Sequence, residues 1–298
     1  MNLLTRFKKA KIILPLLIAL ALVVWAAGAE GGAGISDFNG DGHPDFVLQF
    51  QNLKTPKTAI WYLNNNVFIS AASGPTLPSW WFLGSVADFN RDGHPDFVLL
   101  DSGISPDTAI LYLSGRTLVG RANGPSVPRV PSGWGWVGAA DFNGDGYPDY
   151  LLQNGNTRQT AIWYLKNNVR VGGDFGPTFP NGWSLVGVAD FNRDGHPDYL
   201  LENGTGQTAI WYLSGRMLIG GAYGPKLPSG SWSLAATADF NGDGNPDYLL
   251  YAPNTRQTAI WYLNNNVFIR GAWGPTLPAG WSLFSDFCQK WDYGYGCQ

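Results

Sequence analysis

The chain has 298 residues, of which 45% are hydrophobic and 14% are charged, and its formal net charge is −3. This composition is sufficient for a buried core and is not that of a disordered chain. The acidic balance argues against a nucleic-acid-binding surface, which needs clustered Lys and Arg residues.

The N-terminal segment, residues 1–29, has the order of a secretory signal peptide. Four Lys and Arg residues precede an apolar run over residues 12–25, and small residues end at Ala29. This order predicts cleavage after Ala29 and export, to the medium or the cell surface. An uncleaved anchor is the alternative, because the apolar stretch counted through Ala29 approaches the ~20 residues of a membrane span. Pro15 and the small-residue site favour cleavage, after which no membrane span is expected.

A nine-residue stretch of the form Asp-Phe-Asn-x-Asp-Gly-x-Pro-Asp then occurs five times. The copies begin at Asp37, Asp88, Asp141, Asp190 and Asp239, so the repeat period is 49 to 53 residues. These stretches hold 15 of the 22 acidic residues, and the chain without residues 1–29 has a formal charge of −7. The acidity is therefore concentrated at five points.

Each repeat unit has the same order of segments around this stretch. An apolar segment such as "SLVGVA" comes first, and "DYLLQ", "TAIWYL", a turn, "NVFI" or "TLVG", and "GPTLP" follow the acidic stretch. The turns are rich in Asn and Gly, which tolerate the positive φ of tight hairpins. These signals predict four short strands in each unit.

The third segment, "TAIWYL", is apolar on both of its alternating faces, which indicates a strand with a layer packed on each side. No unit contains a helical pattern long enough to provide that layer, so it must be the sheet of the next unit. The sequence therefore predicts an all-β fold over residues 30–287: a β-propeller of five four-stranded blades. "SLVGVA" would be the innermost strand, and the acidic loop would join the first two strands of each blade.

The end of the repeat region indicates how the ring closes. Residues 280–287, "GWSLFSDF", restart the pattern, and we expect residues 281–287 to complete or flank the first blade. Two alternatives remain: "GGAGIS" at residues 31–36 is itself the inner strand, or a second chain completes the ring. We expect a monomer.

The C-terminal tail, residues 288–298, contains both cysteines, Cys288 and Cys297. In an exported chain this pair predicts a disulfide that closes a short loop outside the core. Free thiols are the alternative.

The acidic loop has the donor pattern of a calcium site. Calcium takes six to eight oxygen ligands, which one tight loop supplies from positions 1, 3, 5 and 9 and a backbone carbonyl at position 7. Gly at position 6 allows the positive φ that folds the chain around an ion. Position 12 is Leu in all five copies, which excludes an EF-hand.

We therefore expect about five Ca²⁺ ions and no other cofactor. The predicted metal ligands are Asp37, Asn39, Asp41, His43 and Asp45; Asp88, Asn90, Asp92, His94 and Asp96; Asp141, Asn143, Asp145, Tyr147 and Asp149; Asp190, Asn192, Asp194, His196 and Asp198; and Asp239, Asn241, Asp243, Asn245 and Asp247. A metal-free Asx-type turn is the alternative.

The five loops and their flanking strands resemble the FG-GAP or VCBS repeats of integrin α-subunit-like propellers. The resemblance covers residues 34–287 and includes the lead-in strand, the loop and the "TAIWYL" strand. It implies a calcium-binding propeller with the loop between the first two strands of each blade. The chain departs from the family in blade number, since family propellers are often seven-bladed.

The sequence gives little indication of catalysis. All three histidines occupy loop position 7, and the acidic residues outside the loops are scattered. We therefore expect no enzyme activity, and a glycan-active enzyme is the least favoured function. The leading interpretation is an extracellular binding module for a glycan or a protein, lectin-like or adhesive, and a structural scaffold of the cell envelope or matrix is the alternative.

The tryptophans are the candidates for a ligand surface. Those of the third strand, at 61, 163, 211 and 261, are expected in the core, and those at 183, 232 and 281 in inter-blade packing. Five others are interpreted as breaking register or clustering in connections, and are the ligand candidates, with packing as the alternative: Trp80, Trp81, Trp134, Trp136 and Trp273.

Overall fold

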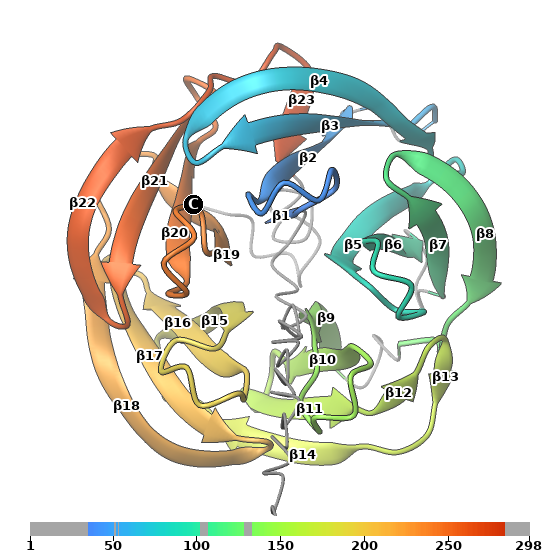
Figure 1. The fold of residues 1–298 in the computed structure, drawn as a ribbon. Helices are drawn as coiled ribbons and strands as arrows, with labels where there is room; N and C mark the ends of the chain where they lie inside the picture. The colour runs from blue at the N-terminus through green and yellow to red at the C-terminus, as the bar shows by residue number, and fades with distance from the viewer. Residues whose placement is uncertain (1–34, 51, 53, 102–106, 128–132, 284–298) are drawn as a thin grey trace, which may run out of the picture.

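The computed structural model describes residues 35–50, 52, 54–101, 107–127 and 133–283. Within these residues the regular elements are β-strands, and no helix is present that is long and apolar enough to cross a membrane. The strands form five antiparallel blades around one axis (Figure 1). The predicted five-bladed propeller is confirmed. The signal segment, residues 284–287 and the Cys288–Cys297 tail lie outside the described residues, so their assignments stay predictions.

The strands follow the chain blade by blade. Blade one contains β1 (Ile35–Ser36), β2 (Asp45–Phe50), β3 (Lys57–Asn64), β4 (Val67–Thr76) and β23 (Trp281–Leu283); blade two β5 (Trp81–Ala87), β6 (Asp96–Asp101), β7 (Thr108–Ser114) and β8 (Thr117–Asn123); blade three β9 (Trp134–Ala140), β10 (Asp149–Asn154), β11 (Gln159–Trp163), β12 (Leu165–Lys166), β13 (Val169–Arg170) and β14 (Asp174–Thr178); blade four β15 (Trp183–Ala189), β16 (Asp198–Asn203), β17 (Gln207–Ser214) and β18 (Met217–Lys226); blade five β19 (Ser233–Ala238), β20 (Asp247–Ala252), β21 (Gln257–Asn264) and β22 (Val267–Trp273).

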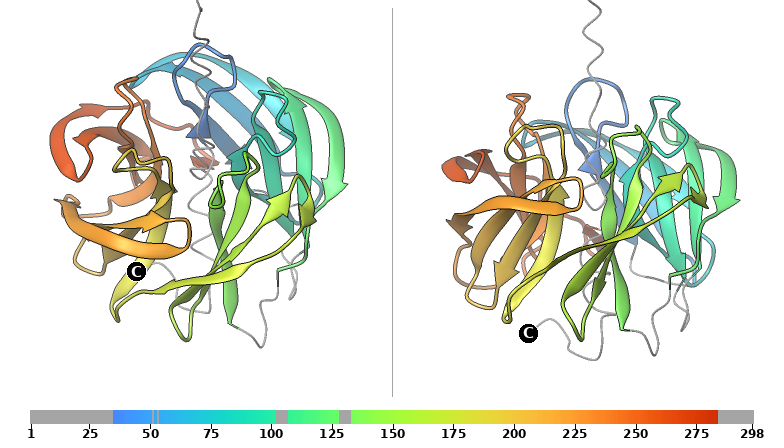
Figure 2. Two further views of the ribbon diagram at one scale, coloured as in Figure 1. Left: turned by 60° about the horizontal axis from the view of Figure 1, so that its bottom comes forward. Right: turned by 90° about the horizontal axis from the view of Figure 1, so that it is seen from below.

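Each blade is an antiparallel meander in which consecutive strands pair. The strand that precedes the acidic loop lies nearest the axis, and the fourth strand lies on the circumference (Figure 1). The side views in Figure 2 show the blades stacked around this axis. The acidic loop and the turn between the third and fourth strands are at the same end of each blade, since two strands separate them.

The turns between the third and fourth strands have the predicted backbone conformation. Their first residue has positive φ, between 53° and 58°, in all five blades: Asn65, Gly115, Asn167, Gly215 and Asn265. The following Asn reaches back to the preceding blade in blades one, three and five. Asn66 Nδ2 donates to the Trp273 carbonyl at 2.9 Å, Asn168 to Asn123 at 2.9 Å and Asn266 to Tyr223 at 3.0 Å.

Blade one is completed by both ends of the described chain. On the inner edge of β2, β1 pairs Ile35 with Phe46, and β23 pairs Leu283 with Leu48. The prediction that residues 281–287 complete the first blade is confirmed for residues 281–283. The alternative that "GGAGIS" forms the inner strand is also partly correct, because Ile35 and Ser36 pair there.

The chain break in blade one falls where the other blades have a β-bulge. In blade four, Leu185 pairs with Leu201 and Val188 with Tyr199, and the register shifts between them. Leu283 and Ile35 occupy the corresponding places in blade one. Pairing is already interrupted at a bulge. Within the described residues, two separate segments therefore supply the inner-edge partners of β2 that one continuous strand supplies in the other blades.

The core lies between the blades and contains a repeated aromatic contact. The Phe at loop position 2 is at most 4% exposed in every copy. It meets, edge to face, the aromatic residue that follows loop position 9 in the next blade, with ring centroids 5.9–6.2 Å apart: Phe38 on Phe97, Phe89 on Tyr150, Phe142 on Tyr199, Phe191 on Tyr248 and Phe240 on Phe46. The last pair joins blade five to blade one, so the same contact closes the ring.

Candidate functional site

The side chain at loop position 1 fixes the backbone of each acidic loop. In the first loop, Asp37 Oδ1 accepts from the N–H of Gly40 at 2.7 Å and Oδ2 accepts from Gly42 at 2.8 Å. The bond to the position-6 glycine recurs at 2.7–2.8 Å in all the other loops. These glycines have φ of 83–87°, as predicted for position 6.

Positions 3 and 5 repeat the same kind of bond over a shorter span. Asn39 Oδ1 accepts from the Asp41 N–H at 3.0 Å, and Asp41 Oδ1 accepts from the His43 N–H at 2.9 Å. The other four loops have equivalent bonds. Side-chain oxygens at positions 1, 3 and 5 thus hold the loop in one conformation through successive Asx turns.

Position 9 is buried in the sheet. Asp45 is 0% exposed, and its two oxygens accept from the N–H groups of Phe38 and Leu63, both at 3.0 Å. Leu63 lies in β3, so this carboxyl fastens the loop to the third strand, and every other copy makes the matching pair of bonds.

Burial raises the pKa of the position-9 carboxyls well above the usual 3.8. The pKa is about 7 for Asp45, Asp96, Asp149 and Asp198 and about 8 for Asp247. Desolvation is the main cause, and the backbone hydrogen bonds oppose it. A nearby cation would favour the ionised form.

The donor set of the loops suits a hard divalent cation. Carboxylate and amide oxygens are the ligands that calcium prefers, and each loop offers them at positions 1, 3 and 5 within one turn. The described residues nevertheless contain no close group of three His, Cys, Asp or Glu side chains arranged to hold a metal. Oxygens at positions 1, 5 and 9 instead accept from backbone N–H groups. The residues thus fit calcium in their chemistry, and the ligand assignments stay predictions.

Two arginines connect neighbouring loops. Arg91, at position 4 of the second loop, donates from Nη1 to the Asp145 carbonyl at 3.3 Å, and its guanidinium lies 5.1 Å from the Tyr147 ring centroid. Arg193 approaches Gly244 in the fifth loop in the same way. The third and fifth loops therefore have a cationic side chain from the preceding blade beside their carboxylates.

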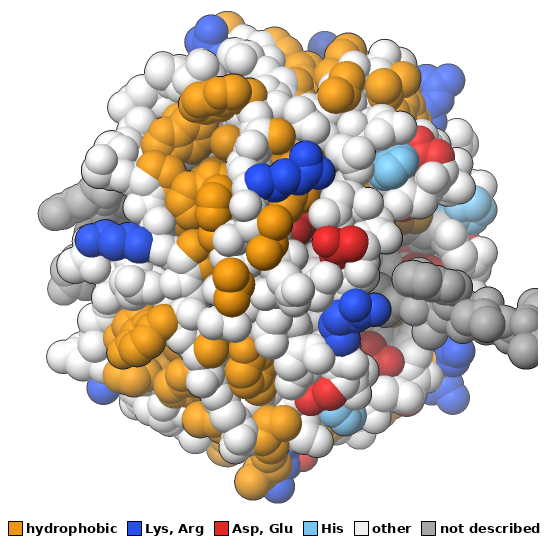
Figure 3. All heavy atoms as spheres, turned by 60° about the vertical axis from the view of Figure 1, so that its left-hand side comes forward, with side chains coloured by type: hydrophobic (Ala, Val, Ile, Leu, Met, Phe, Trp, Pro, Cys, Tyr) orange, Lys and Arg blue, Asp and Glu red, His pale blue; other side chains and the backbone are white. Residues whose placement is uncertain are grey.

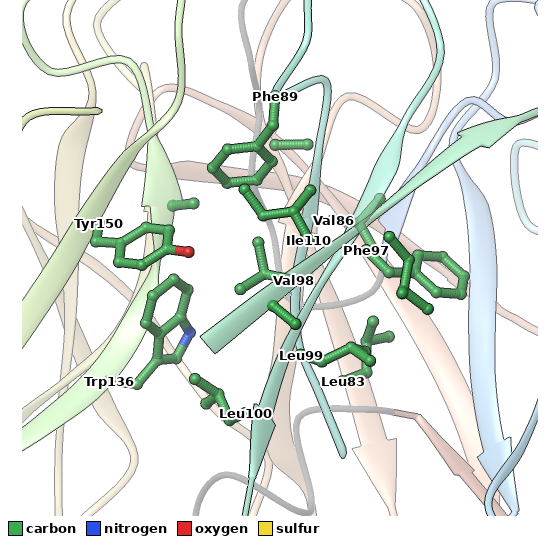
Figure 4. Packing of buried hydrophobic residues seen from close by; sticks show 14 of the residues in the cluster. Leu83, Val86, Phe89, Phe97, Val98, Leu99, Leu100, Ile110, Trp136 and Tyr150 are labelled. Atoms are coloured by element: carbon green, nitrogen blue, oxygen red, sulfur yellow. The ribbon is translucent and has the colours of Figure 1, made fainter. Parts of the chain in front are cut away.

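Trp136 is a core residue, which contradicts its assignment to a ligand surface. It is 6% exposed, its ring meets Tyr150 edge to face at 4.4 Å, and its Nε1 donates to the Gly84 carbonyl at 3.0 Å. Figure 4 shows its indole beside Tyr150 among the residues of blade two. Its pairing partner is Leu152, and Leu residues pair at this position in the other blades. Trp136 is therefore a large residue at a leucine position.

We predict that Trp136→Ala lowers the free energy of unfolding by about 3–5 kcal/mol, since it leaves a cavity between two blades. Trp136→Leu, which restores the residue of the other blades, should cost less. The matched control is Trp80→Ala: Trp80 is 52% exposed, so the change should stay within about 0.5 kcal/mol. Denaturant melts measure all three, and equal stability of the Trp136→Ala and Trp80→Ala proteins would show that residue 136 is not a core position.

Trp81 and Trp134 do not break the repeat register. Each begins the inner strand of its blade, at the position that Trp183 and Trp281 occupy in blades four and one. The prediction that Trp81 and Trp134 break the repeat register or cluster in connections was therefore wrong. All four are half-buried. The tryptophans of the third strand are also half-buried at the edge of the core, and only Leu111 at that position is fully buried.

Trp273 is exposed and belongs to a set that the sequence did not reveal. Trp273 lies on β22 and is 67% exposed. Its ring centroid is 5.7 Å from that of Trp232, the residue directly before the inner strand β19. Tyr223 is placed in the same way against Trp183 at 6.3 Å, and Phe175 against Trp134 at 6.0 Å. Three blades thus carry an aromatic pair made by the first and fourth strands, which no short-range pattern predicts.

The fold and the loops define a repeat propeller with one acidic loop in each blade. The model of the FG-GAP-like repeat matches residues 37–99, 88–152, 141–201 and 190–250. These matches cover more than half of the chain, which therefore belongs to the FG-GAP-like repeat family. A propeller of this family provides the scaffold of a binding module.

Similar solved structures include the Photorhabdus luminescens Tc holotoxin pore, with 15% identity and a TM-score of 0.45 over 85% of this chain and 12% of that chain. The β-propeller domain of Cps50 (Swd1) from Myceliophteria thermophila has 12% identity and a TM-score of 0.40 over 84% of this chain and 88% of that chain. No curated protein matches the chain.

Proposed function

We propose that the protein is a secreted or cell-surface, calcium-stabilised binding module for an extracellular glycan or protein, and that it is not an enzyme. The observation that carries this proposal is the set of exposed aromatic side chains held on a rigid scaffold, Phe175, Tyr223 and Trp273. Each of these rings is 60–71% exposed and lies beside a second aromatic ring, and contiguous exposed apolar surface marks interaction sites. Rings with a flat apolar face and a polar edge suit saccharides and protein partners.

Calcium would act as a structural ion in this proposal. The five loops bring their carboxylates together at one end of the blades, and a cation would offset the repulsion among them. The loops also join the inner strands of the ring, so their conformation affects every inter-blade contact. Residues 1–29 would direct the export that exposes these loops to extracellular calcium.

The remaining acidic side chains support a non-catalytic role. Asp107 hydrogen-bonds the Ser126 hydroxyl, Asp174 pairs with Arg216 at 3.5 Å, and Glu202 is partly buried in β16 with a raised pKa caused by desolvation. Asp101 lies with Asp107 in blade two, where the Asp101 N–H donates to the Asp107 carbonyl at 3.2 Å, so the four described acidic residues outside the loops are distributed over three blades. No repeat relation marks Asp101 and Asp107 as the carboxyl pair that a glycosidase uses.

A glycan array tests the proposal. The full secreted chain is applied with calcium and again with chelator, beside an array of extracellular proteins. We expect saturable binding to a restricted set of glycans that is reduced by chelation. Failure to bind any glycan or protein, by a chain that is folded and calcium-loaded, would favour the scaffold alternative. Hydrolysis of a bound glycan would overturn the non-catalytic assignment.

A further inference from the structure

We infer that blades three, four and five each bind one pyranose ring at their aromatic pair, and that blades one and two do not. The protein would thus have three equivalent saccharide sites. This inference rests on the proposed function, because it assumes that the ligand is a glycan.

The sites are defined by one register position of the outer strand. This position pairs with an Ala of the third strand that is the same in all five blades, while the residue itself changes: Ser73, Asn123, Phe175, Tyr223 and Trp273, in blade order. The scaffold around the position is constant and its side chain is not. A surface position of this kind is where binding properties differ between copies of one repeat.

The inner-strand tryptophan supplies the second ring. In blade three the planes of Trp134 and Phe175 are 22° apart, in blade four Trp183 and Tyr223 are 34° apart, and in blade five Trp232 and Trp273 are 45° apart. The two rings of each pair lie against each other, and the outer ring keeps 60–71% of its surface exposed. The C–H face of a pyranose packs on such a surface while its hydroxyl groups stay solvated.

The groove of blade four has the dimensions and chemistry of a small-ligand site. It has a volume of about 560 Å³, within the range of ligand pockets. Trp183, Trp211 and Tyr223 line it together with Gly220 and Gly221, and none of its lining residues is charged. A neutral ligand with one flat apolar face fits this lining. Figure 3, which views the side of β18 and β22, shows hydrophobic side chains gathered in patches there.

The backbone at two of the three outer aromatics is held by the neighbouring blade. Asn266 of blade five donates to the Tyr223 carbonyl at 3.0 Å, and Asn66 of blade one donates to the Trp273 carbonyl at 2.9 Å. Phe175 has no equivalent partner among the described residues, because the turn of blade four is Ser-Gly-Arg. A backbone that is already held loses little conformational entropy on binding.

Blades one and two have the inner-strand tryptophan but lack the outer aromatic ring. Trp281 packs on Phe50 at 5.4 Å, and the guanidinium of Arg121 lies 5.4 Å from the Trp81 ring centroid. The outer-strand residues there, Ser73 and Asn123, offer no aromatic face. These blades serve as internal controls.

The experiment uses methyl glycosides of glucose, galactose, mannose and N-acetylglucosamine as probes, with the full chain in calcium. Binding is followed by the NMR shifts of the tryptophan indole N–H groups. For at least one glycoside we expect shifts of Trp134, Trp183 and Trp232 and none of Trp81. Replacing one outer aromatic by Ser, the residue of blade one, should abolish the shifts of its own partner and leave the other two sites unchanged.

The decisive variants change all three sites or add one. The triple variant Phe175→Ser, Tyr223→Ser and Trp273→Ser should weaken binding by at least about tenfold at every site, while Ser73→Ala should change nothing. Asn123→Tyr should create a fourth site that shifts Trp81, and Tyr223→Trp should retain the site in blade four. Thermal melts check that each variant is folded. We expect all of them to fold, because the replaced side chains are exposed.

The outcomes separate the two proposals. If the wild-type chain binds no glycoside and no array glycan, the proposed glycan function fails. If it binds glycosides and the folded triple variant binds them equally well, the sites inferred here are wrong and the glycan function stands. Binding of a proline-rich peptide at these residues, with no saccharide binding, would also overturn the inference.

Discussion

A chain that ends at Gly280 should fail to form a stable ring, whereas a chain that ends at Leu283 should melt within a few degrees of the full protein. The two truncations differ only in β23. The shorter chain loses the pairing of three residues with β2 and the burial of Leu283, which is 2% exposed in the core between blades one and five. Loss of a buried Leu costs about 2–5 kcal/mol, and the unpaired inner edge of β2 adds to it.

The total is comparable to the stability of many domains. Thermal melts and size-exclusion chromatography compare the two truncations, and Leu283→Ala in the full chain provides an intermediate. Both truncations remove the predicted Cys288–Cys297 disulfide, so its contribution cancels in the comparison. Equal melting temperatures for the two chains would show that β23 does not close the ring.

Chelation of calcium should lower the melting temperature strongly. A ligand that binds only the folded state adds about 1.4 kcal/mol for each tenfold excess over its dissociation constant. For extracellular-type sites of roughly 0.1–1 mM, millimolar calcium adds on the order of 1 kcal/mol per loop, or ~5 kcal/mol over the ring. Calcium should restore the melt better than magnesium, whose smaller octahedral shell suits such loops poorly.

The structure indicates which variants test the calcium assignment cleanly. Asp145 is exposed, and Asn in its place keeps an oxygen that can accept from the Tyr147 N–H, so Asp145→Asn should remove one site in five with little other damage. Asp141 is less suitable, because its two oxygens accept from three backbone N–H groups of the same loop. Asp149 is a poor choice, since it is 0% exposed and accepts from two backbone N–H groups. Calorimetric titration measures the stoichiometry. A melt that chelator leaves unchanged, in protein shown to be free of metal, would contradict the calcium proposal.

The fold was predictable because the sequence contains five copies of one repeat unit, which can be aligned with one another. Five copies of one unit show which positions vary and which do not, and the Asn and Gly residues at 65, 115, 167, 215 and 265 have the positive φ that their turns require. The inner-strand position of "SLVGVA" followed from its place before the loop. Closure was harder to predict, since β1 has two residues and β23 three, too few for a period to be recognised.

The burial of Trp136 and the pairing of the exposed aromatics could not be predicted from the sequence. Trp136 occupies a leucine position beyond a β-bulge, and a bulge shifts which side chains share a face. The aromatic pairs join the first and fourth strands of one blade across two others, a contact that depends on sheet twist and not on alternation. The Phe at loop position 2 was also missed, although it is the same in all five copies and an aromatic residue follows position 9 in each.

The split inner strand of blade one has a consequence for biosynthesis. Since β2 needs β23 along half of its inner edge, the first blade to leave the ribosome is the last to be completed. Until residues 281–283 emerge, Leu48, Gln49 and Phe50 present an unpaired strand edge that another chain can occupy. For nearly the whole of its synthesis, this chain therefore exposes an edge at which domain swapping or aggregation can compete with ring closure.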